Sequence, residues 1–244
     1  MRDNKCKRIT NVGFILVLFV VGMLMTGVNV KASETSDLDF RGGPYTYNNI
    51  DFMIIDHKGM RANITDGTKC TSSNLNLEEL QYINDYSKTK AELFGEAEWT
   101  AYVQKIDKNA FKGNKKIKKI TGNFIDLDTI GDGAFQGMSN LKEIDLSYTA
   151  SLSIGKNAFA GDKKLKVVKL DMVSLKSIGK NAFKGTPSGI KFVLYCDHDD
   201  EELDMSGKAV KREQKRFKKY KKTLTKMLKK SGAKNPKIVS YLDD

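Results

Sequence analysis

The residues best suited to chemistry are two histidines and two cysteines. His57 lies in DHKG, while Cys196 and His198 flank Asp197 and precede four further acidic residues, 199–202, in CDHDDEE. This cluster has neither the paired ligand spacing of structural zinc sites nor the glycine and spaced oxygen ligands of an EF-hand. A nucleophile pair of Cys70 with His57 or His198 matches no local motif. We therefore expect a solvated acidic loop at 199–202, with no metal, no cofactor and no enzymatic activity.

The elements that must position these residues follow from a repeat. The hexapeptide IGKNAF occurs at 154–159 and again at 178–183, 24 residues later. Apolar residues, alanines and glycines recur at the same step between residues 106 and 194, which indicates four copies of one unit. The main columns are Ile106, Ile130, Ile154 and Ile178; Phe111, Phe135, Phe159 and Phe183; Gly113, Gly137, Gly161 and Gly185; and Ile120, Ile144, Val168 and Phe192.

Each position of this unit has a physical role. The ends of the units, LKEIDL and LKVVKL, alternate as strands with one buried face do. Phenylalanine fills the coil interior, alanine stands where neighbouring coils crowd, and glycine allows a turn that a side chain would obstruct. One unit cannot bury its own apolar edge, so the units stack. The sequence therefore predicts a β-rich solenoid of four 24-residue units over 101–195.

Two of the units carry a family resemblance. IGDGAFQGMSNLKEIDL at 130–146 and IGKNAFAGDKKLKVVKL at 154–170 resemble the BspA-like leucine-rich repeats of bacterial secreted and cell-surface proteins. NIDFMIIDHKGMRANIT at 49–65 resembles the lead-in hairpin of such proteins. The resemblance implies a leucine-rich repeat fold and an adhesion-type interaction module.

Residues 33–100 are expected to form an N-terminal α/β cap. IDFMIID partly alternates and DHKG suits a turn, which predicts a hairpin. The following SSNLNLEELQYINDYSKTKAELF predicts a helix, in which Asn76 is the N-cap and Glu79 completes a capping box.

Residues 1–32 read as a secretory signal peptide. A basic head precedes an apolar stretch, and Val30-Lys31-Ala32 offers small side chains for cleavage before Ser33. An uncleaved membrane anchor is the alternative, because no charged residue interrupts residues 9–30. Either interpretation predicts a secreted or cell-surface protein.

Residues 196–244 are expected to form a C-terminal cap with a lysine-rich amphipathic helix. Apolar residues from Val210 to Leu228 follow helical spacing, and Gly232 suits the end of the helix.

The charge of the chain is concentrated in this segment. Residues 205–237 hold 14 Lys or Arg and one Glu, a net charge of +13, whereas residues 33–204 carry a net charge of −3. The lysines are either simply solvated or hold an anionic cell-envelope polymer. The candidate polymer-binding residues are Lys211, Arg212, Lys215, Arg216, Lys218, Lys219 and Lys222. Nucleic acid is not expected, because the aromatic residues Phe217 and Tyr220 lie on the packing stripe.

A disulfide between Cys70 and Cys196 can be tested by geometry. Cys70 precedes the repeats and Cys196 follows them. Three steps between strands about 4.8 Å apart separate the ends by about 15 Å, whereas a disulfide needs Cα atoms within about 7 Å. We therefore expect free thiols.

The predicted strands also present side chains to solvent. The outward rows vary in character while the buried columns stay constant, as in a recognition surface, although unconstrained solvent positions would vary too. We predict that this strand face binds a protein or glycan on a cell surface, and that the protein is a monomer. The candidate residues are Lys119, Thr121, Glu143, Asp145, Val167, Lys169, Asp171, Lys191 and Tyr195, with Asn123, Ser147 and Val193 in the same rows.

Overall fold

The computed structural model describes residues 41–56, 60–77, 79–83, 98–122, 124, 126–171, 173–195 and 207–241. The predicted signal peptide, His57, Asn123, and the segment that holds Cys196, His198 and the acidic loop lie outside these residues. Among the helices that the structure describes, none is long and apolar enough to cross a bilayer.

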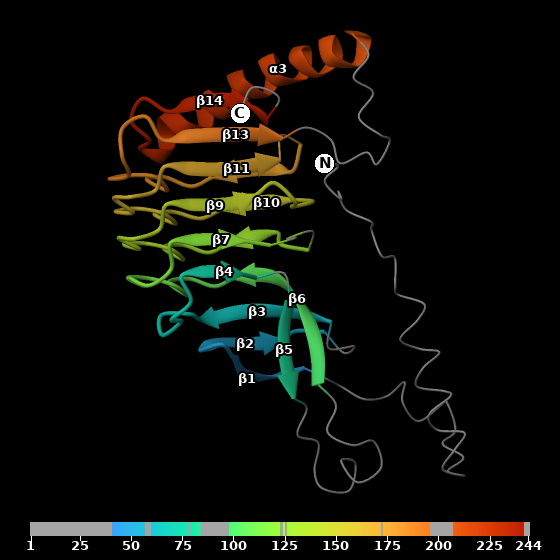
Figure 1. Cartoon of the computed structure of the whole chain (residues 1–244), viewed down its shortest axis with the longest axis vertical. Helices are drawn as coiled ribbons and strands as arrows, with labels where there is room; N and C mark the ends of the chain where they lie inside the picture. Colours follow the sequence, from blue (N-terminus) through green and yellow to red (C-terminus); the bar gives the residue numbers. More distant parts are fainter. Residues whose placement is uncertain are drawn as a thin grey trace, which may run out of the picture. The chain divides into compact units, whose positions relative to one another are not determined.

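The chain forms a stack of coils, and two sheets run along the stack (Figure 1). Sheet 1 has the order β1-β2-β3-β6-β8-β10-β12, and β5 pairs with β6. Its strands are β1 (Gly42–Tyr47), β2 (Ile50–Ile54), β3 (Arg61–Asp66), β5 (Glu79–Ile83), β6 (Glu98–Ile106), β8 (Thr129–Ile130), β10 (Leu152–Ile154) and β12 (Leu175–Ile178).

Sheet 2 has the order β4-β7-β9-β11-β13-β14, and its strands pair in parallel throughout. They are β4 (Asn74–Asn76), β7 (Lys119–Thr121), β9 (Glu143–Leu146), β11 (Val167–Asp171), β13 (Lys191–Tyr195) and β14 (Lys237–Ser240). Glu143 pairs with Val167 and Val167 with Lys191, so the register in sheet 2 advances by the 24 residues that the sequence predicts.

A ladder of phenylalanine rings fills the interior of the coils. Phe111, Phe135, Phe159 and Phe183 are fully buried. Successive ring centroids lie 5.4, 5.2 and 5.1 Å apart with nearly parallel planes. This contact lets each coil cover the ring of the next. The apolar columns predicted from the repeat are confirmed as the core, except that Ile178 in the last coil is only partly buried.

The turn before each phenylalanine explains the repeated hexapeptide. Asn157 and Asn181 have φ angles of 55° and 61°, a left-handed conformation that asparagine and glycine tolerate. A Cβ on Gly155 would lie 2.7 Å from the backbone of Gly131 in the preceding coil, so only glycine fits there. At Gly137 a Cβ would meet no neighbouring atom, so crowding does not require glycine there. Its φ angle of 75° does, because this left-handed conformation favours glycine.

The N-terminal region differs from the prediction. The hairpin is confirmed, because β2 and β3 pair antiparallel. The prediction of a helix is wrong for the part of this segment that the structure describes, because residues 74–76 and 79–83 form strands. Residues 84–97 lie outside the described residues. Leu75 and Leu77 are buried while Asn74 and Asn76 are exposed, so alternation with period two overrides the local capping signal.

This region also forms a coil that the four-copy prediction missed. Strand β3 pairs in parallel with β6, and β4 pairs in parallel with β7. Asn114 ties that coil to the next by donating to the carbonyls of Gly67 (3.1 Å) and Cys70 (2.9 Å). Cys70 is a buried free thiol.

The predicted lysine-rich helix is present as α3 (Gly207–Ser231), at the other end of the stack (Figure 1). The last carbonyls of a helix have no partners within it. Here the N–H groups of Asn181 and Phe183, in the last repeat, donate to the carbonyls of Lys230 (3.3 Å) and Ser231 (2.8 Å). Strand β14, which was not predicted, then pairs in parallel with β13 and extends sheet 2. The helix end and β14 thus take the place of one further coil.

Candidate functional site

The outward rows of sheet 2 lie where the repeat spacing places them. Lys119 pairs in register with Glu143, and Glu143 with Val167. Asp145 pairs with Lys169 in the neighbouring row. The predicted residues Lys119, Thr121, Glu143, Asp145, Val167, Lys169, Lys191 and Tyr195 are all partly exposed.

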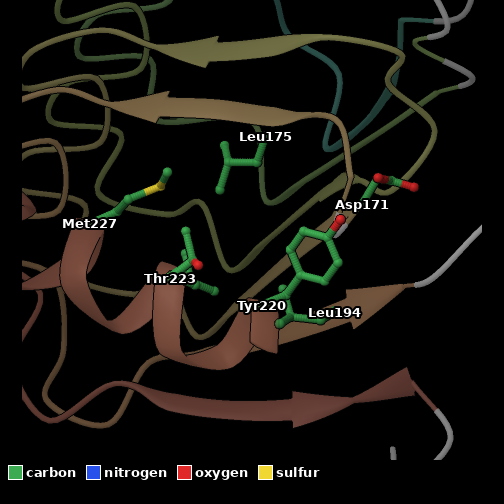
Figure 2. A pocket seen from close by; sticks show the side chains of 7 residues that line it. Asp171, Leu175, Leu194, Tyr220, Thr223 and Met227 are labelled. Carbon is green, nitrogen blue, oxygen red and sulfur yellow. The ribbon is translucent and has the colours of Figure 1, made fainter. Parts of the chain in front are cut away.

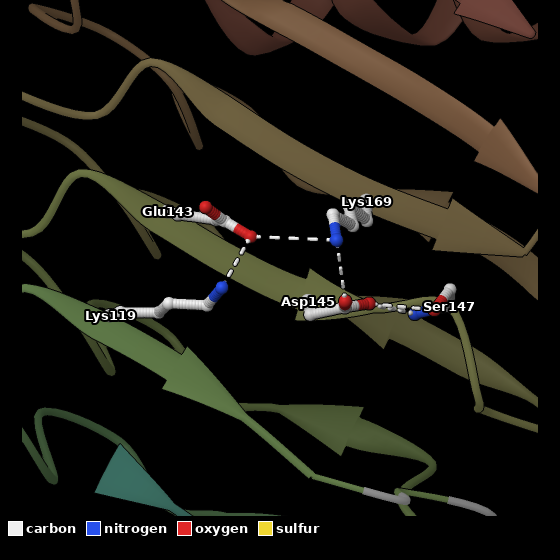
Figure 3. Close-up of polar contacts among 5 residues, drawn as sticks. All are labelled: Lys119, Glu143, Asp145, Ser147 and Lys169. Atoms are coloured by element: carbon white, nitrogen blue, oxygen red, sulfur yellow. Dashed lines mark hydrogen bonds and ion pairs between the residues drawn. The ribbon is translucent and has the colours of Figure 1, made fainter. Parts of the chain in front are cut away.

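Charged side chains at one end of this face bind each other (Figure 3). Lys119 Nζ lies 3.1 Å from Glu143 Oε1, which is 3.5 Å from Lys169 Nζ. Lys169 Nζ also lies 3.1 Å from Asp145 Oδ2, and Asp145 Oδ1 accepts the Ser147 hydroxyl at 2.6 Å. Two lysines and two carboxylates therefore form a network without net charge.

The network keeps Lys169 protonated. Burial by itself would lower the pKa of this lysine, but the hydrogen bond and charge of Asp145, together with Tyr195 and Glu143, outweigh it and raise the pKa. Partly exposed ion pairs of this kind stabilise a fold by about 0.2–1 kcal/mol each. A ligand would have to compete with these internal partners, so this end of the face is poorly suited to charge-based recognition.

Three positions predicted to face solvent are buried. Asp171 is only 4% exposed, because its Oδ1 accepts the backbone N–H groups of Val173 and Ser174 and so caps the turn after β11. Ser147 and Val193 are buried as well. Asp171 therefore has a structural role at this turn, and the prediction that its side chain faces solvent is wrong.

Strand β14 adds residues to the face that sequence reasoning missed. Lys237 pairs in register with Lys191, and Val239 with Val193. The Tyr195 and Tyr241 rings stack with centroids 5.3 Å apart and planes 18° from parallel. The alternation in KIVS was a usable signal, but the step from Lys191 to Lys237 is not 24 residues, because α3 intervenes.

The second predicted site, on α3, is strongly cationic. The helix holds twelve Lys or Arg and one Glu. Lys211, Arg212, Lys215, Lys218, Lys219 and Lys222 are exposed, as predicted. Arg216 is different, because it is partly buried and lies 3.1 Å from Glu213 Oε1. Lys226 and Lys229, which are equally exposed, were missed from the predicted set.

A small pocket lies where α3 meets the last coils (Figure 2). It is lined by Asp171, Leu175, Leu194, Tyr220, Thr223, Leu224 and Met227, and its volume is about 50 Å³. Ligand pockets usually measure about 300–1,000 Å³. We therefore interpret it as a packing gap beneath the apolar stripe of the helix.

One buried carboxyl group lies in the core and away from both faces. Asp162 is fully buried; its Oδ1 accepts the backbone N–H of Met138 at 2.8 Å, and its Oδ2 has no hydrogen-bond partner. Burial raises the pKa of Asp162 to about 9, although backbone hydrogen bonds from Met138 and Gly137 oppose the shift. This group bears on stability, and its setting between coils gives it no access to a ligand.

Groups suited to catalysis or metal binding are sparse in the part of the chain that the structure describes. No cluster of three or more metal-ligating side chains occurs among those residues. Burial raises the pKa of the Cys70 thiol, which makes it a poor nucleophile. The two faces described above are therefore the candidate sites.

Comparison with known proteins identifies the repeat. A family model described as BspA type leucine rich repeat region matches residues 63–197 in six copies, which is more than half of the chain. The match begins in β3, inside the segment predicted as the N-terminal cap, and it adds two copies to the four predicted.

Two solved structures are similar in part. A leucine-rich repeat protein of T. pallidum, TpLRR, is 16% identical with a TM-score of 0.34, over 62% of this chain and 72% of that one. The pneumococcal vaccine antigen PcpA is 18% identical with a TM-score of 0.36, and the match covers 65% of this chain and 51% of that one. No curated protein matches the chain. On the strength of the family match, the chain belongs to the BspA-type leucine-rich repeat family, whose members are typically surface and interaction proteins.

Proposed function

We propose that this protein is a secreted or cell-surface module of the adhesion type, which binds a protein or glycan partner through the outer face of sheet 2. One observation carries the proposal: in-register parallel strands present rows of side chains, most of which are partly exposed. A rigid backbone of this kind loses little conformational freedom on binding. The module acts as a monomer and is exported by the signal peptide at 1–32.

The end of the face formed by β11, β13 and β14 is the better binding surface. We call it the tyrosine patch; it consists of Val167, Lys191, Tyr195, Lys237, Val239 and Tyr241, all partly or fully exposed. Interface centres are enriched in aromatic residues and depleted in charged ones. The opposite end of the face is rich in charged residues and has no aromatic side chain among the predicted residues. Its lysines and carboxylates already pair with each other.

Replacing Tyr241 with alanine should weaken binding of the purified protein to cell-surface fractions by at least about tenfold, since buried tyrosines at interfaces often contribute more than about 1 kcal/mol. Tyr148→Ala is the matched control, because Tyr148 is 50% exposed and follows the end of β9. The measurement is an equilibrium binding curve on host-cell and bacterial envelope fractions, at low and high salt.

The outcome locates the surface. A loss confined to Tyr241→Ala, and present at both salt concentrations, supports the tyrosine patch. Equal losses in Tyr241→Ala and Tyr148→Ala, or no loss in either, would contradict it. Circular dichroism of each variant checks that the stack remains folded.

A second candidate function rests on α3. Its twelve cations and one acid give this single helix a net charge of +11. The helix would then retain the protein at an anionic envelope polymer, with the repeats as its scaffold. This function predicts binding that weakens steeply with salt, whereas contacts of the tyrosine patch should tolerate salt.

A further inference from the structure

We infer that six lysines on the solvent face of α3 form a linear track for one ligand class, a phosphodiester-linked polymer without bases, and that binding there stabilises the C-terminal cap. The inference rests on the second candidate function. It goes further by assigning the residues, the chemistry of the polymer and a link between binding and folding.

The track is defined by spacing and exposure. Lys211, Lys215, Lys218, Lys222, Lys226 and Lys229 follow each other at steps of three or four residues, which places them in one row along a helix. All six are exposed. From Lys211 to Lys229 the row covers 18 residue steps, or about 27 Å at 1.5 Å per step. We call it the lysine row.

The acidic side chains that the structure describes do not neutralise the charge of the lysine row. Within the described part of the chain, no acidic side chain forms an ion pair with any of the six lysines. Glu213, the one acid of the helix, pairs with Arg216 at 3.1 Å and lies 4.0 Å from Arg212 Nε, both of which stand off the row. Like charges three or four residues apart destabilise a helix. A cap needs only a polar outer face, so its packing role does not account for this repulsion.

The chemistry around the lysine row selects the ligand. Lysine binds phosphate as a point charge and demands no planar partner, unlike arginine. Tyr220 lines the pocket against the last coils, and Phe217 is partly buried beside Lys221, whose Nζ lies 5.4 Å from the ring centroid. Neither ring offers a stacking platform for bases.

A bilayer is the weaker fit for the same surface. Leu224 and Leu228 are buried, so the apolar stripe of the helix is unavailable for insertion at its C-terminal half. Interfacial helices derive much of their affinity from such insertion. A linear polymer needs only the row of charges, and it can follow the whole row.

Polymer binding should also stabilise the folded state of the C-terminal helix. The carbonyls of Lys230 and Ser231, which accept hydrogen bonds from the last repeat, lie one and two residues beyond the end of the lysine row. A polyanion relieves the repulsion within α3 and so favours the helical state that presents these carbonyls. The cap and the binding site are therefore thermodynamically linked.

The test uses the purified protein with synthetic poly(glycerol phosphate), vesicles of equal parts phosphatidylcholine and phosphatidylglycerol, and single-stranded DNA, matched in phosphate concentration. The row variant carries Lys211→Gln, Lys215→Gln, Lys218→Gln and Lys222→Gln, because glutamine keeps helix propensity. The control variant carries Lys112→Gln, Lys116→Gln, Lys163→Gln and Lys180→Gln, which are exposed on the repeats and change the net charge equally.

The wild-type protein should bind poly(glycerol phosphate) most tightly, with a slope of log affinity against log salt of about −4 for six contacts at about −0.7 each. The row variant should lose at least about tenfold in affinity and flatten the slope by about 3. The control variant should keep both values. The polymer should raise the thermal midpoint of the wild-type protein and leave that of the row variant unchanged.

Tighter binding of vesicles or DNA than of poly(glycerol phosphate), or equal losses in the two variants, would overturn the inference. Retention on bacterial envelopes, measured in parallel, distinguishes failure of the polymer assignment from failure of the second candidate function. If the row variant loses envelope retention but the purified polymer is not bound, the second candidate function survives and the polymer assignment fails. If retention is unchanged as well, both fail.

Discussion

Replacing Phe159 with alanine should lower the free energy of unfolding by about 3–5 kcal/mol, the usual cost of deleting a buried phenylalanine. Phe159 is fully buried and stacks on both sides, with ring centroids 5.2 Å from Phe135 and 5.1 Å from Phe183. The substitution would open a cavity in the middle of the ladder, where the neighbouring coils are pinned by backbone hydrogen bonds such as Phe159 N–H to Ala182 C=O. Urea unfolding followed by circular dichroism measures the effect.

The position in the ladder makes this prediction specific. Tyr148→Ala removes an exposed aromatic side chain and should change stability by less than about 0.5 kcal/mol. Because repeat proteins can lose cooperativity when an internal unit is weakened, the slope of the unfolding transition should be compared as well as its midpoint. A loss no larger than that of Tyr148→Ala would show that the ring ladder does not hold the coils together.

The second large effect should come from Asp162→Asn and should depend on pH. The folded-state pKa of Asp162 is about 9, against an ordinary value of 3.8. The folded state therefore favours the neutral carboxyl group, and this group's contribution to stability is greatest below pH 3.8 and is lost as the pH rises towards 9. At 1.36 kcal/mol per pKa unit, the difference between pH 5 and pH 8 is about 4 kcal/mol.

Asparagine at position 162 should remove the loss of stability at high pH and preserve the fold. It retains an oxygen to accept the Met138 N–H, and Asn114 already occupies the same column two coils earlier. We expect Asp162→Asn to be more stable than wild type at pH 8, and the advantage to shrink by about 4 kcal/mol at pH 5.

Unfolding free energies at the two pH values, for both proteins, provide the measurement. Asp132→Asn, at an exposed position, should leave the wild-type difference between pH 5 and pH 8 unchanged. If wild type and Asp162→Asn change equally between the two pH values, the buried carboxyl group does not control the pH response.

The candidate sites were only partly predictable. The outward rows followed from the strand pattern, since side chains alternate across a sheet. Sequence alone could not show that Lys119, Glu143, Asp145 and Lys169 neutralise each other, because these residues meet only when the three strands β7, β9 and β11 lie in register. Nor could the sequence show that the Asp171 carboxylate accepts hydrogen bonds from the backbone of its own turn.

The ends of the solenoid show the same limit. The capping-box pattern at Asn76 is a local signal, and it failed because β4 pairs with β7, 45 residues later in the chain. Strand β14 was missed because it pairs with β13 across the whole of α3. Pairings of this length leave no period in the sequence.

By itself, the sequence determined the repeat, its 24-residue register and the identity of the core. Each coil meets the same surroundings as the last, so the same physical demands select the same residues at a constant spacing. Only the tertiary structure decided how the stack is closed, which outward charges are already paired and where the tyrosine patch forms. Those features depend on single, unrepeated contacts between distant segments, and such contacts are specified by the folded chain as a whole.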